Sequence, residues 1–406
     1  MTSIKRIIPA VQQYPWGKKG KESAVARLLP EFCPNSRYAE LWIGSHPSAS
    51  ALVDNPAGQS LRELIAAEPR VCLGDMVRGR FGELPFLLKI LSIGEPLSIQ
   101  AHPDRARAEN LHRTFPQHYP DPNHKPEMGV ALTTVHLLFG LKERQLLVDT
   151  FARYPMLLGL VSHDLIPELQ GASNFLSDSA LQRATYRSLI TAPSSERIGA
   201  VHNICNTLLN TPPTSYFEER IPQLVEMYGP EDIGILSGLL LNEVVLSPRQ
   251  AIFIAPGIPH SYLSGDLIEC MAVSDNVVRA GLTRKYQDTE TLLDMLDYGA
   301  TTKEVIEAIA APESPQTLNY ETPTAEFSLS IIHRANQSLT YQKGDKPEML
   351  FLLEGAAVIT TNNEHSISLR AGEGAFVPAA VNTYKLAANS CSFVRVTVPD
   401  SSVSAK

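Results

Sequence analysis

The sequence predicts a mainly β protein with a helical insertion, and three observations support this fold class. Short apolar runs bounded by Gly, Pro or Asn fill residues 1–141, a pattern typical of strands separated by turns. Helical periodicity replaces that pattern over residues 142–241. Strand-like runs return over 242–310 and dominate the chain again over 325–406. The 406 residues are enough for two or three domains of about 150 residues each.

Four apolar runs carry the strand prediction in residues 1–141. They are "YAELWIGSHP" (38–47), "LPFLLKIL" (84–91), "PLSIQAH" (96–102) and "TTVHLLFGL" (133–141). We expect this all-β segment to form the first part of one domain.

The middle of the chain carries the helical patterns. Apolar residues recur at helical spacing in "ERQLLVDTFARYPMLLGL" (143–160), "SALQRATYRSLITA" (179–192), "SSERIGAVHNICNTLLN" (194–210), "YFEERIPQLVEMY" (216–228) and "DIGILSGLLLNEV" (232–244). Residues 142–241 therefore read as a helical domain inserted into the β domain.

The β domain resumes with "QAIFIAPGIPHSYLSGDLIECMA" (250–272), where the pair Gly265 and Asp266 between apolar runs predicts a hairpin turn. We place the second part of the domain at 242–310. "TTKEVIEAIAAP" (301–312) predicts a helix, and the Pro, Ser and Thr content of 311–324 predicts a linker. Residues 325–406 then form a separate β domain.

One internal similarity connects the two β regions. "FIAPGIPHSYL" (253–263) aligns with "AFVPAAVNTYK" (375–385), which superposes two prolines and two tyrosines and sets His260 opposite Asn382. Two related β modules, the second without the imidazole, explain the match, and chance similarity between Pro-containing strands is the alternative.

Composition excludes several classes of protein. The five cysteines form no Cys-x-x-Cys pair, which argues against a disulfide framework and a thiolate zinc site and favours a reducing cytoplasm. The net charge is −8 and the basic residues form no long runs, which argues against nucleic-acid binding. No apolar run approaches the roughly 18 residues of a membrane span or resembles a signal peptide, so we expect no membrane association.

The stretch "PLSIQAHPD" (96–104) supplies the first candidate site residues. Side chains alternate along a strand, so Ser98, Gln100 and His102 share one face. We expect that face to line a cavity, where these side chains could bind a ligand, and the opposite face to pack in the core. A core histidine bonded to a backbone carbonyl is the commoner alternative.

"NHKPEMGVAL" (123–132) adds His124, Lys125 and Glu127 just before a strand-like run, and Pro126 restricts Lys125 to extended geometry. Three polar functions in four residues are hard to place in a core. A solvated turn is the alternative reading.

"APGIPHSYL" (255–263) holds His260 after two prolines, and Tyr262 lies on the same face if the strand continues. Such a rigid imidazole suits a metal. Gln100, His102, Glu127 and His260 together offer two nitrogens and two oxygens, a set that zinc tolerates with water or substrate at a further position. Iron, manganese, nickel and cobalt accept the same ligand types.

"ECMAVSDNVVRAGLTRKY" (269–286) contains Asp275, Arg279 and several further polar residues. Arginine matches phosphate geometry, and Arg279 with Lys125 can supply the local positive field that the acidic chain lacks overall. A solvated charged loop is the alternative.

These motifs resemble known ones. Gly94 with Gln100-x-His102, followed by Gly257-x-x-His260, resembles the two metal motifs of the cupin superfamily, with Gln in place of the first histidine. More specifically, the chain resembles type I mannose-6-phosphate isomerases in "YPWG" (14–17), "AELWIGSHP" (39–47), "PLSIQAHPD" (96–104), "HKPEM" (124–128), "APGIPHSYLSG" (255–265) and "SDNVVRAGLT" (274–283).

The resemblance implies a jelly-roll cupin barrel for the catalytic domain, a helical domain and a noncatalytic C-terminal cupin-like barrel. It implies one Zn²⁺ per chain on Gln100, His102, Glu127 and His260. It places Lys125, Asp275 and Arg279 in the sugar-phosphate site, and we add Ser98 and Tyr262 as substrate-binding candidates. Lys125, Asp275 and His124 all remain candidates for the acid or base.

The implied reaction interconverts mannose 6-phosphate and fructose 6-phosphate through a cis-enediol(ate), with the proton moving between C1 and C2. We expect a cytoplasmic monomer that acts on this small molecule. A sugar-phosphate-binding sensor without catalysis and an iron-dependent cupin oxygenase are the alternatives.

Overall fold

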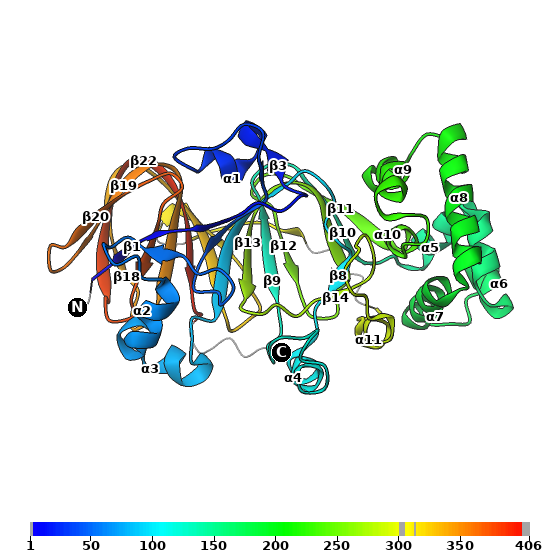
Figure 1. Cartoon of the computed structure of the whole chain (residues 1–406), viewed down its shortest axis with the longest axis horizontal. Helices are drawn as coiled ribbons and strands as arrows, with labels where there is room; N and C mark the ends of the chain where they lie inside the picture. The colour runs from blue at the N-terminus through cyan, green and yellow to red at the C-terminus, as the bar shows by residue number, and fades with distance from the viewer. Residues whose placement is uncertain (1–2, 300–304, 312–313, 400–406) are drawn as a thin grey trace.

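A computed structural model describes residues 3–299, 305–311 and 314–399. The molecule is elongated, with one β-sheet at the left of Figure 1, a second sheet in the centre and a group of helices at the right. All strand pairs in the described residues are antiparallel, so the predicted combination of β structure and a helical region is confirmed at this level. The jelly-roll cupin description stays a prediction.

The central sheet holds the predicted site. Within the described residues it has eleven strands: β2 (Ala10–Gln12), β5 (Glu40–Ile43), β7 (Phe86–Ile93), β8 (Gln100–Ala101), β9 (Glu127–Ala131), β10 (Val135–Leu141), β11 (Leu241–Leu246), β12 (Ala251–Ile254), β13 (His260–Ala272), β14 (Val278–Arg279) and β15 (Val305–Ile306). A separate pair is formed by β3 (Lys18–Lys19) and β4 (Arg37–Tyr38).

The other large sheet contains strands from both ends of the chain. Its nine described strands are β1 (Lys5–Ile8), β6 (Leu52–Val53), β16 (Ile309–Ala311), β17 (Ser314–Tyr320), β18 (Ser328–Gln342), β19 (Glu348–Thr361), β20 (Ser366–Arg370), β21 (Gly374–Val377) and β22 (Thr383–Thr397). The linker prediction for 311–324 is wrong, because β17 pairs with β18 along four residues. This sheet also includes β1 and β6, so it is not built from residues 325–406 alone; the four domain boundaries stay a prediction.

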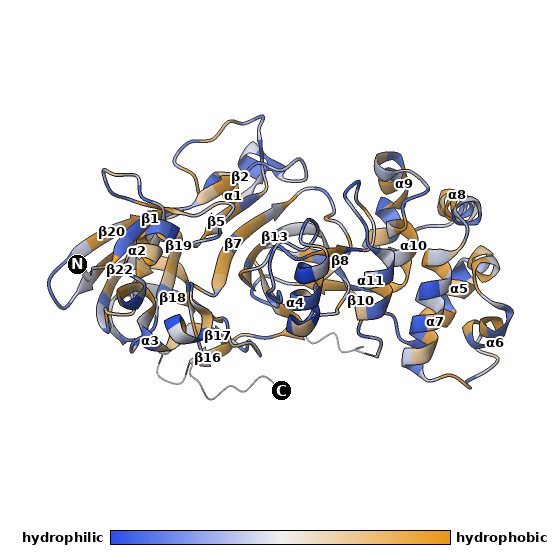
Figure 2. Ribbon diagram, turned by 60° about the horizontal axis from the view of Figure 1, so that its bottom comes forward, coloured by the Kyte–Doolittle hydropathy of each residue, from blue (hydrophilic) through white to orange (hydrophobic). Residues whose placement is uncertain are grey.

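The helical region matches its prediction closely. Its helices are α5 (Arg144–Arg153), α6 (Ile166–Leu169), α7 (Asp178–Thr191), α8 (Ser194–Asn210), α9 (Tyr216–Tyr228) and α10 (Gly234–Leu239), with 3-10 turns at Pro155–Leu160 and His163–Leu165. Figure 2 shows hydrophilic and hydrophobic residues alternating along α7 and α9, as expected for helices with one buried face. The exception is Leu241–Val244, which forms part of β11 rather than a helix.

The all-β prediction for residues 1–141 is wrong in part. This region contains short helices: α1 (Ala24–Arg27), α2 (Leu61–Ala67), α3 (Pro69–Phe81) and α4 (Arg105–Thr114), with a 3-10 turn at Gly20–Glu22. Their start signals are present in the sequence. Ser60 and Glu63 form a capping box, Pro69 occupies the first turn of α3, and Asp104 caps α4.

Two further expectations after residue 250 fail. No hairpin turns at Gly265, because β13 runs through it without interruption and changes partner there from β10 to β7. The helix expected at 301–312 is replaced by β15 and β16 over its described residues, while 301–304 and 312 lie outside them. The helix α11 (Thr289–Met295) lies just before this segment.

The internal similarity has a structural counterpart. His260 begins β13 after the turn from β12, and Asn382 lies just before β22 after the turn from β21. The tetrapeptide Lys-Pro-Glu-Met also occurs twice, at 125–128 and 346–349. It places Glu127 opposite Ile254 in one sheet and Glu348 opposite Val377 in the other. The alignment sets Ile254 on Phe376, so the strand partners of the two glutamates correspond to within one residue, which favours two related modules over chance.

Two predictions from composition can be compared with the structure. All five cysteines are free. Among the described residues, no helix has the length and apolar character needed to span a bilayer.

Candidate metal centre and substrate site

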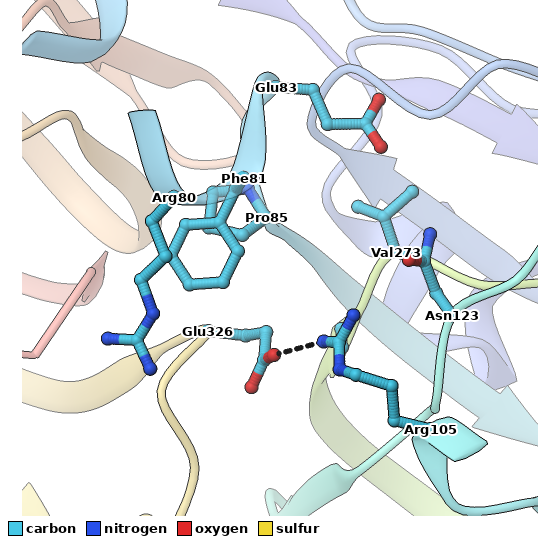
Figure 3. A pocket seen from close by; sticks show the side chains of 9 residues that line it. Arg80, Phe81, Glu83, Pro85, Arg105, Asn123, Val273 and Glu326 are labelled. Atoms are coloured by element: carbon cyan, nitrogen blue, oxygen red, sulfur yellow. Dashed lines mark hydrogen bonds and ion pairs between the residues drawn. The ribbon is translucent and has the colours of Figure 1, made fainter. Parts of the chain in front are cut away.

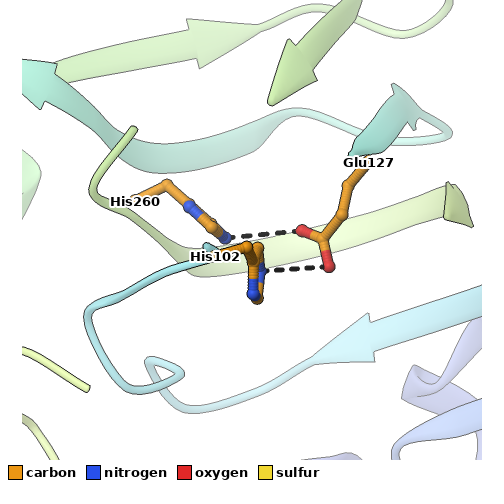
Figure 4. Close-up of side chains that lie close together, drawn as sticks. All are labelled: His102, Glu127 and His260. Atoms are coloured by element: carbon orange, nitrogen blue, oxygen red, sulfur yellow. Dashed lines mark ion pairs between the residues drawn. The ribbon is translucent and has the colours of Figure 1, made fainter. Parts of the chain in front are cut away.

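Three predicted ligands from separate segments converge in the central sheet. His102 follows β8, Glu127 begins β9 and His260 begins β13, and all three are buried. Figure 4 shows the two imidazoles directed at the two carboxylate oxygens, with Nε2 of His102 at 3.3 Å and Nε2 of His260 at 3.4 Å. The candidate ligand atoms lie within 4.8 Å of one another, a spacing that can hold a metal ion.

Backbone carbonyls orient both imidazoles. Nδ1 of His102 lies 2.8 Å from the carbonyl oxygen of Asn276, and Nδ1 of His260 lies 3.0 Å from that of Ile258. A carbonyl only accepts, so each Nδ1 carries a hydrogen, and Nε2 is the nitrogen of each ring that can bind a metal. Both Nε2 atoms point toward Glu127, as in a metal-ligating histidine.

The ligand atoms lack the partners that burial normally requires. In the part of the chain that the structure describes, Nε2 of His102 and Oε2 of Glu127 are buried without a hydrogen bond. Unpaired buried polar atoms cost free energy, and a cation between them would satisfy both. The residues present therefore fit a bound divalent metal.

Gln100 lies beside this cluster. It pairs with His260 across β8 and β13, and its amide nitrogen lies 3.5 Å from Nε2 of His260. An amide presents its oxygen in place of its nitrogen after a half turn, so Gln100 can supply an oxygen ligand at the same position.

The electrostatics of the cluster favour metal binding. Burial alone would raise the pKa of Glu127, but the charge of Lys125 and the contacts with the histidines outweigh it and hold that pKa well below its usual range. Burial lowers the pKa of His102 to about 4. At neutral pH the site therefore offers an ionised carboxylate and a neutral imidazole, the forms that bind metals.

Two predicted cations lie next to the ligands. The Lys125 ammonium is 3.0 Å from Oε1 of Glu127. Arg279 pairs in register with Gln100 across β14 and β8, and burial lowers the pKa of its guanidinium. Arg279 forms no ion pair with any described carboxylate, so its charge is available to an anionic ligand.

Asp275 contacts residues that are not part of the ligand set. One of its carboxylate oxygens is 3.5 Å from Nε2 of His46 and the other 3.4 Å from the hydroxyl of Ser48. Nearly half of the Asp275 side chain is exposed. The carboxylate is thus accessible, while the buried His46 and a backbone bond to Asp121 limit its movement.

Of the other three predicted residues, His124 and Tyr262 point away from the ligands, whereas Ser98 lies near Gln100. Nε2 of His124 is 2.8 Å from Glu326, on the opposite side of its segment from Lys125, because neighbouring residues of an extended chain alternate faces. Tyr262 is only 2% exposed and packs in an apolar cluster, so it does not reach an open surface. Ser98 is partly exposed beside β8.

His124 instead belongs to a second cluster. Glu326 also accepts from Arg105, and both line a pocket with Arg80 and Phe81, as Figure 3 shows. This cluster joins the segment before β18 to the start of α4, which follows Gln100 and His102, and to the segment that leads to Glu127.

Sequence reasoning missed a buried ion-pair network beneath the site. Lys89 lies 3.3 Å from Glu269 and 3.6 Å from Glu40, with its ammonium 4.9 Å from the centre of the Trp42 ring. Burial and Glu127 raise the pKa of Glu269 to about 7 despite Lys89. The signal was available, because Lys89 and Glu269 each interrupt an apolar run.

The fold and this site together define a class of protein: an antiparallel β protein with a buried two-histidine, one-carboxylate metal centre and adjacent cations for an anionic ligand.

Comparison with known proteins identifies the family. The family model described as "Phosphomannose isomerase type I, catalytic domain" matches residues 4–144. Human mannose-6-phosphate isomerase is 36% identical, over 92% of this chain and 94% of its own length. The Candida albicans enzyme of the same name is 35% identical over 90% of this chain and 88% of its own length.

Solved structures agree. A mutant phosphomannose isomerase from Salmonella typhimurium superposes with a TM-score of 0.85 at 30% identity, covering 98% of this chain and 99% of the other. A mannose 6-phosphate isomerase bound with zinc and yttrium gives a TM-score of 0.84 at 30% identity, covering 98% and 100%. The chain belongs to the type I phosphomannose isomerase family.

Proposed function

We propose that this protein interconverts D-mannose 6-phosphate and D-fructose 6-phosphate. The observation that carries the proposal is a metal-ligand set in which Nε2 of His102 and Oε2 of Glu127 are buried without a hydrogen bond, together with Arg279, a partly buried cation that has no carboxylate partner among the described residues. Family membership supports the same reaction.

The metal proposed for the site is one Zn²⁺ per chain, on His102, Glu127, His260 and the Gln100 oxygen. When bound, it supplies a Lewis acid that polarises the sugar oxygens. A relative bound to zinc supports this choice of metal.

The cations near the metal centre have separate proposed roles. Arg279 binds the phosphate or stabilises negative charge on the reacting sugar, since guanidinium groups keep their proton. Lys125 holds Glu127 ionised, and its ammonium lies next to the proposed metal ligands, where we place the sugar. Ser98, partly exposed beside Gln100, is proposed to contact the substrate.

A proton must move between C1 and C2, so one side chain must act as acid and base. Lys125 and Asp275 remain the candidates: Lys125 contacts Glu127, Asp275 is an accessible carboxylate next to Asn276, whose carbonyl binds His102, and both side chains can exchange a proton. His124 leaves the proposal because Glu326 binds its Nε2. Tyr262, which the sequence offered only as a substrate-binding residue, is not included because it is buried in the apolar cluster.

The test is a coupled assay of mannose 6-phosphate conversion before chelation, after chelation and after zinc is restored. Activity that is lost and then recovered supports both the reaction and the metal. A folded, zinc-loaded protein that binds the sugar phosphate without turnover would favour the sensor. Oxygen uptake by the iron-loaded protein would favour the oxygenase.

The remaining expectations stay predictions: a cupin-type barrel in both sheets, a monomer and a cytoplasmic location. Sedimentation at several concentrations checks the oligomeric state.

A further inference from the structure

Asn276 lies between two segments that build the metal centre. It follows Asp275 and is completely buried, although its side chain is polar. On one side, its backbone carbonyl accepts from Nδ1 of His102 at 2.8 Å. On the other, its side chain faces residues 121–123, the segment that leads to Lys125 and Glu127.

The side-chain amide binds that segment at three points. Its nitrogen donates to the carbonyl oxygens of Asp121 at 2.6 Å and Asn123 at 2.9 Å, and lies 3.2 Å from the Asp121 carboxylate. Residues 121–123 in turn hold the residues around Asn276, because the other Asp121 carboxylate oxygen accepts from the backbone N–H of Asp275 at 2.8 Å.

The geometry requires a donor at this position. Two backbone carbonyls converge on one side-chain nitrogen, so a carboxylate would be repelled by both. An apolar group would leave the Asp121 carbonyl without this donor, while the Asn123 carbonyl would keep its bond from the Ser274 hydroxyl at 3.1 Å. The amide oxygen is buried and bonds to none of the described residues, so the side chain holds the segment through its nitrogen alone.

We propose that Asn276 is a positioning residue of the metal centre. Its backbone carbonyl orients His102, and its side chain holds the segment that carries Lys125 and Glu127 at a fixed distance from that carbonyl. The ligand atoms are thereby set at metal-binding distance before the ion arrives. The part concerning Lys125 rests on the proposed isomerase function; the part concerning His102 and Glu127 does not.

The test is Asn276→Asp, which keeps the size of the side chain and places carboxylate oxygens against the two carbonyls. We expect zinc affinity, measured by competition with a chelator, to fall about 10- to 100-fold, as for other groups that orient metal ligands. The visible absorption bands of the cobalt-substituted protein should change as well, because they report the geometry of the ligands.

Asn123→Ala is the matched control. It removes a bond of 3.2 Å between the Asn123 amide and the Val273 carbonyl, which joins the same two segments, but leaves all the bonds of Asn276 in place. We expect its zinc affinity to stay within about threefold of the parent and its cobalt spectrum to be unchanged. An equal loss in both variants would overturn the proposal, since any loosening of the loop would then suffice.

If Asn276→Asp does not fold, Asn276→Ser takes its place. Its shorter side chain cannot reach both carbonyls and introduces no charge. A folded variant with parental zinc affinity and cobalt spectrum would overturn the role of Asn276. A parent protein that binds zinc tightly but does not isomerise mannose 6-phosphate would instead overturn the proposed function, so the two failures are distinguishable.

Discussion

At the scale of single residues, His260 is both the first residue of β13 and a proposed metal ligand. Replacing it with Ala removes one imidazole and leaves Glu127 with fewer partners. We expect zinc affinity to fall more than about 100-fold and activity to disappear with it. Metal analysis after dialysis and the coupled assay check both, and a metal-free variant with full activity would disprove the ligand assignment.

Arg279 should separate substrate binding from metal binding. In Arg279→Ala the ligand set is intact, so we expect zinc to be retained while kcat/KM falls about 10²- to 10³-fold, the usual cost of losing a group that stabilises developing charge. Arg279→Lys keeps the charge but not the planar geometry and should recover only part of the loss. A drop in zinc content in either variant would contradict this separation.

The sequence could predict the metal ligands but not everything around them. Gln100, His102 and His260 can be predicted from the sequence because alternation along a strand and proline rigidity are local properties. Lys89 and Glu269 each interrupt an apolar run, but their pairing with one another does not follow from the sequence, because it arises where β7 lies beside β13 and these residues are far apart in the chain. The face to which His124 points depends on Glu326, about two hundred residues away.

At the scale of elements, the path of β13 depends on Gly265. Its φ of +117° is unfavourable for other residues, and an added Cβ would lie 2.6 Å from the carbonyl oxygen of Thr134. We expect Gly265→Ala to lower the free energy of unfolding by about 2 to 4 kcal/mol. Urea denaturation measures this directly.

Gly199 is the control for that substitution. It lies inside α8, and a Cβ there meets no atom within 4 Å. Because Ala has a higher helix propensity than Gly, Gly199→Ala should stabilise the protein by up to about 1 kcal/mol. Similar losses in both variants would show that the conformation at Gly265 is not the cause.

The segment before β18 should make stability depend on pH. Burial alone would raise the pKa of Glu326, but hydrogen bonds from His124 and Thr324 and the charge of Arg105 outweigh it and lower the pKa from 4.5 to about 2. A lowered carboxyl pKa stabilises the folded state above pH 4.5, and the gain disappears as the pH falls toward 2. Arg105 is half exposed, so we expect a gain of about 2 kcal/mol at neutral pH.

Glu326→Gln should therefore unfold more easily than the parent at pH 7, and the difference should shrink by about 1 kcal/mol at pH 4. Urea titrations at both pH values measure it. Glu321→Gln, at an exposed position in the same segment, should show no such difference. A difference for Glu326→Gln that stays constant between pH 4 and 7 would contradict the ion-pair explanation.

Element prediction succeeded where the pattern was long and local. The bounds of α8 and α9 agree with the prediction to the residue, because each has a continuous apolar face and a clear start. The sequence analysis does not predict α2 and α3, although Ser60 and Pro69 mark their starts, because α2 has only seven residues and α3 shows little periodicity. The local pattern at 301–312 favours a helix, but β15 and β16 form within it because pairing with other strands overrides local preference.

At the scale of the whole molecule, the first strands join the two large sheets. β1 pairs with β21 in one sheet, and β2, two residues further on, pairs with β5 in the other. One apolar core contains residues of both sheets, including Ile43 and Phe86 from the central sheet and Phe376 from the other. No local pattern could predict this, because it pairs the two ends of the chain.

Ile7 tests whether the two sheets unfold together. It is fully buried in the shared core, whereas Ile8 on the same strand is 51% exposed, because side chains alternate. We expect Ile7→Ala to lower the free energy of unfolding by about 2 to 4 kcal/mol and Ile8→Ala by less than about 1 kcal/mol.

The shared core also predicts how Ile7→Ala unfolds. The loss of β-sheet signal and the loss of bound zinc should shift to lower urea concentration together, although the metal centre lies only in the central sheet. Circular dichroism and a zinc-sensitive dye follow the two events in one titration. If the zinc-release midpoint matched that of Ile8→Ala while the sheet signal shifted, β1 would stabilise its own sheet without supporting the metal centre.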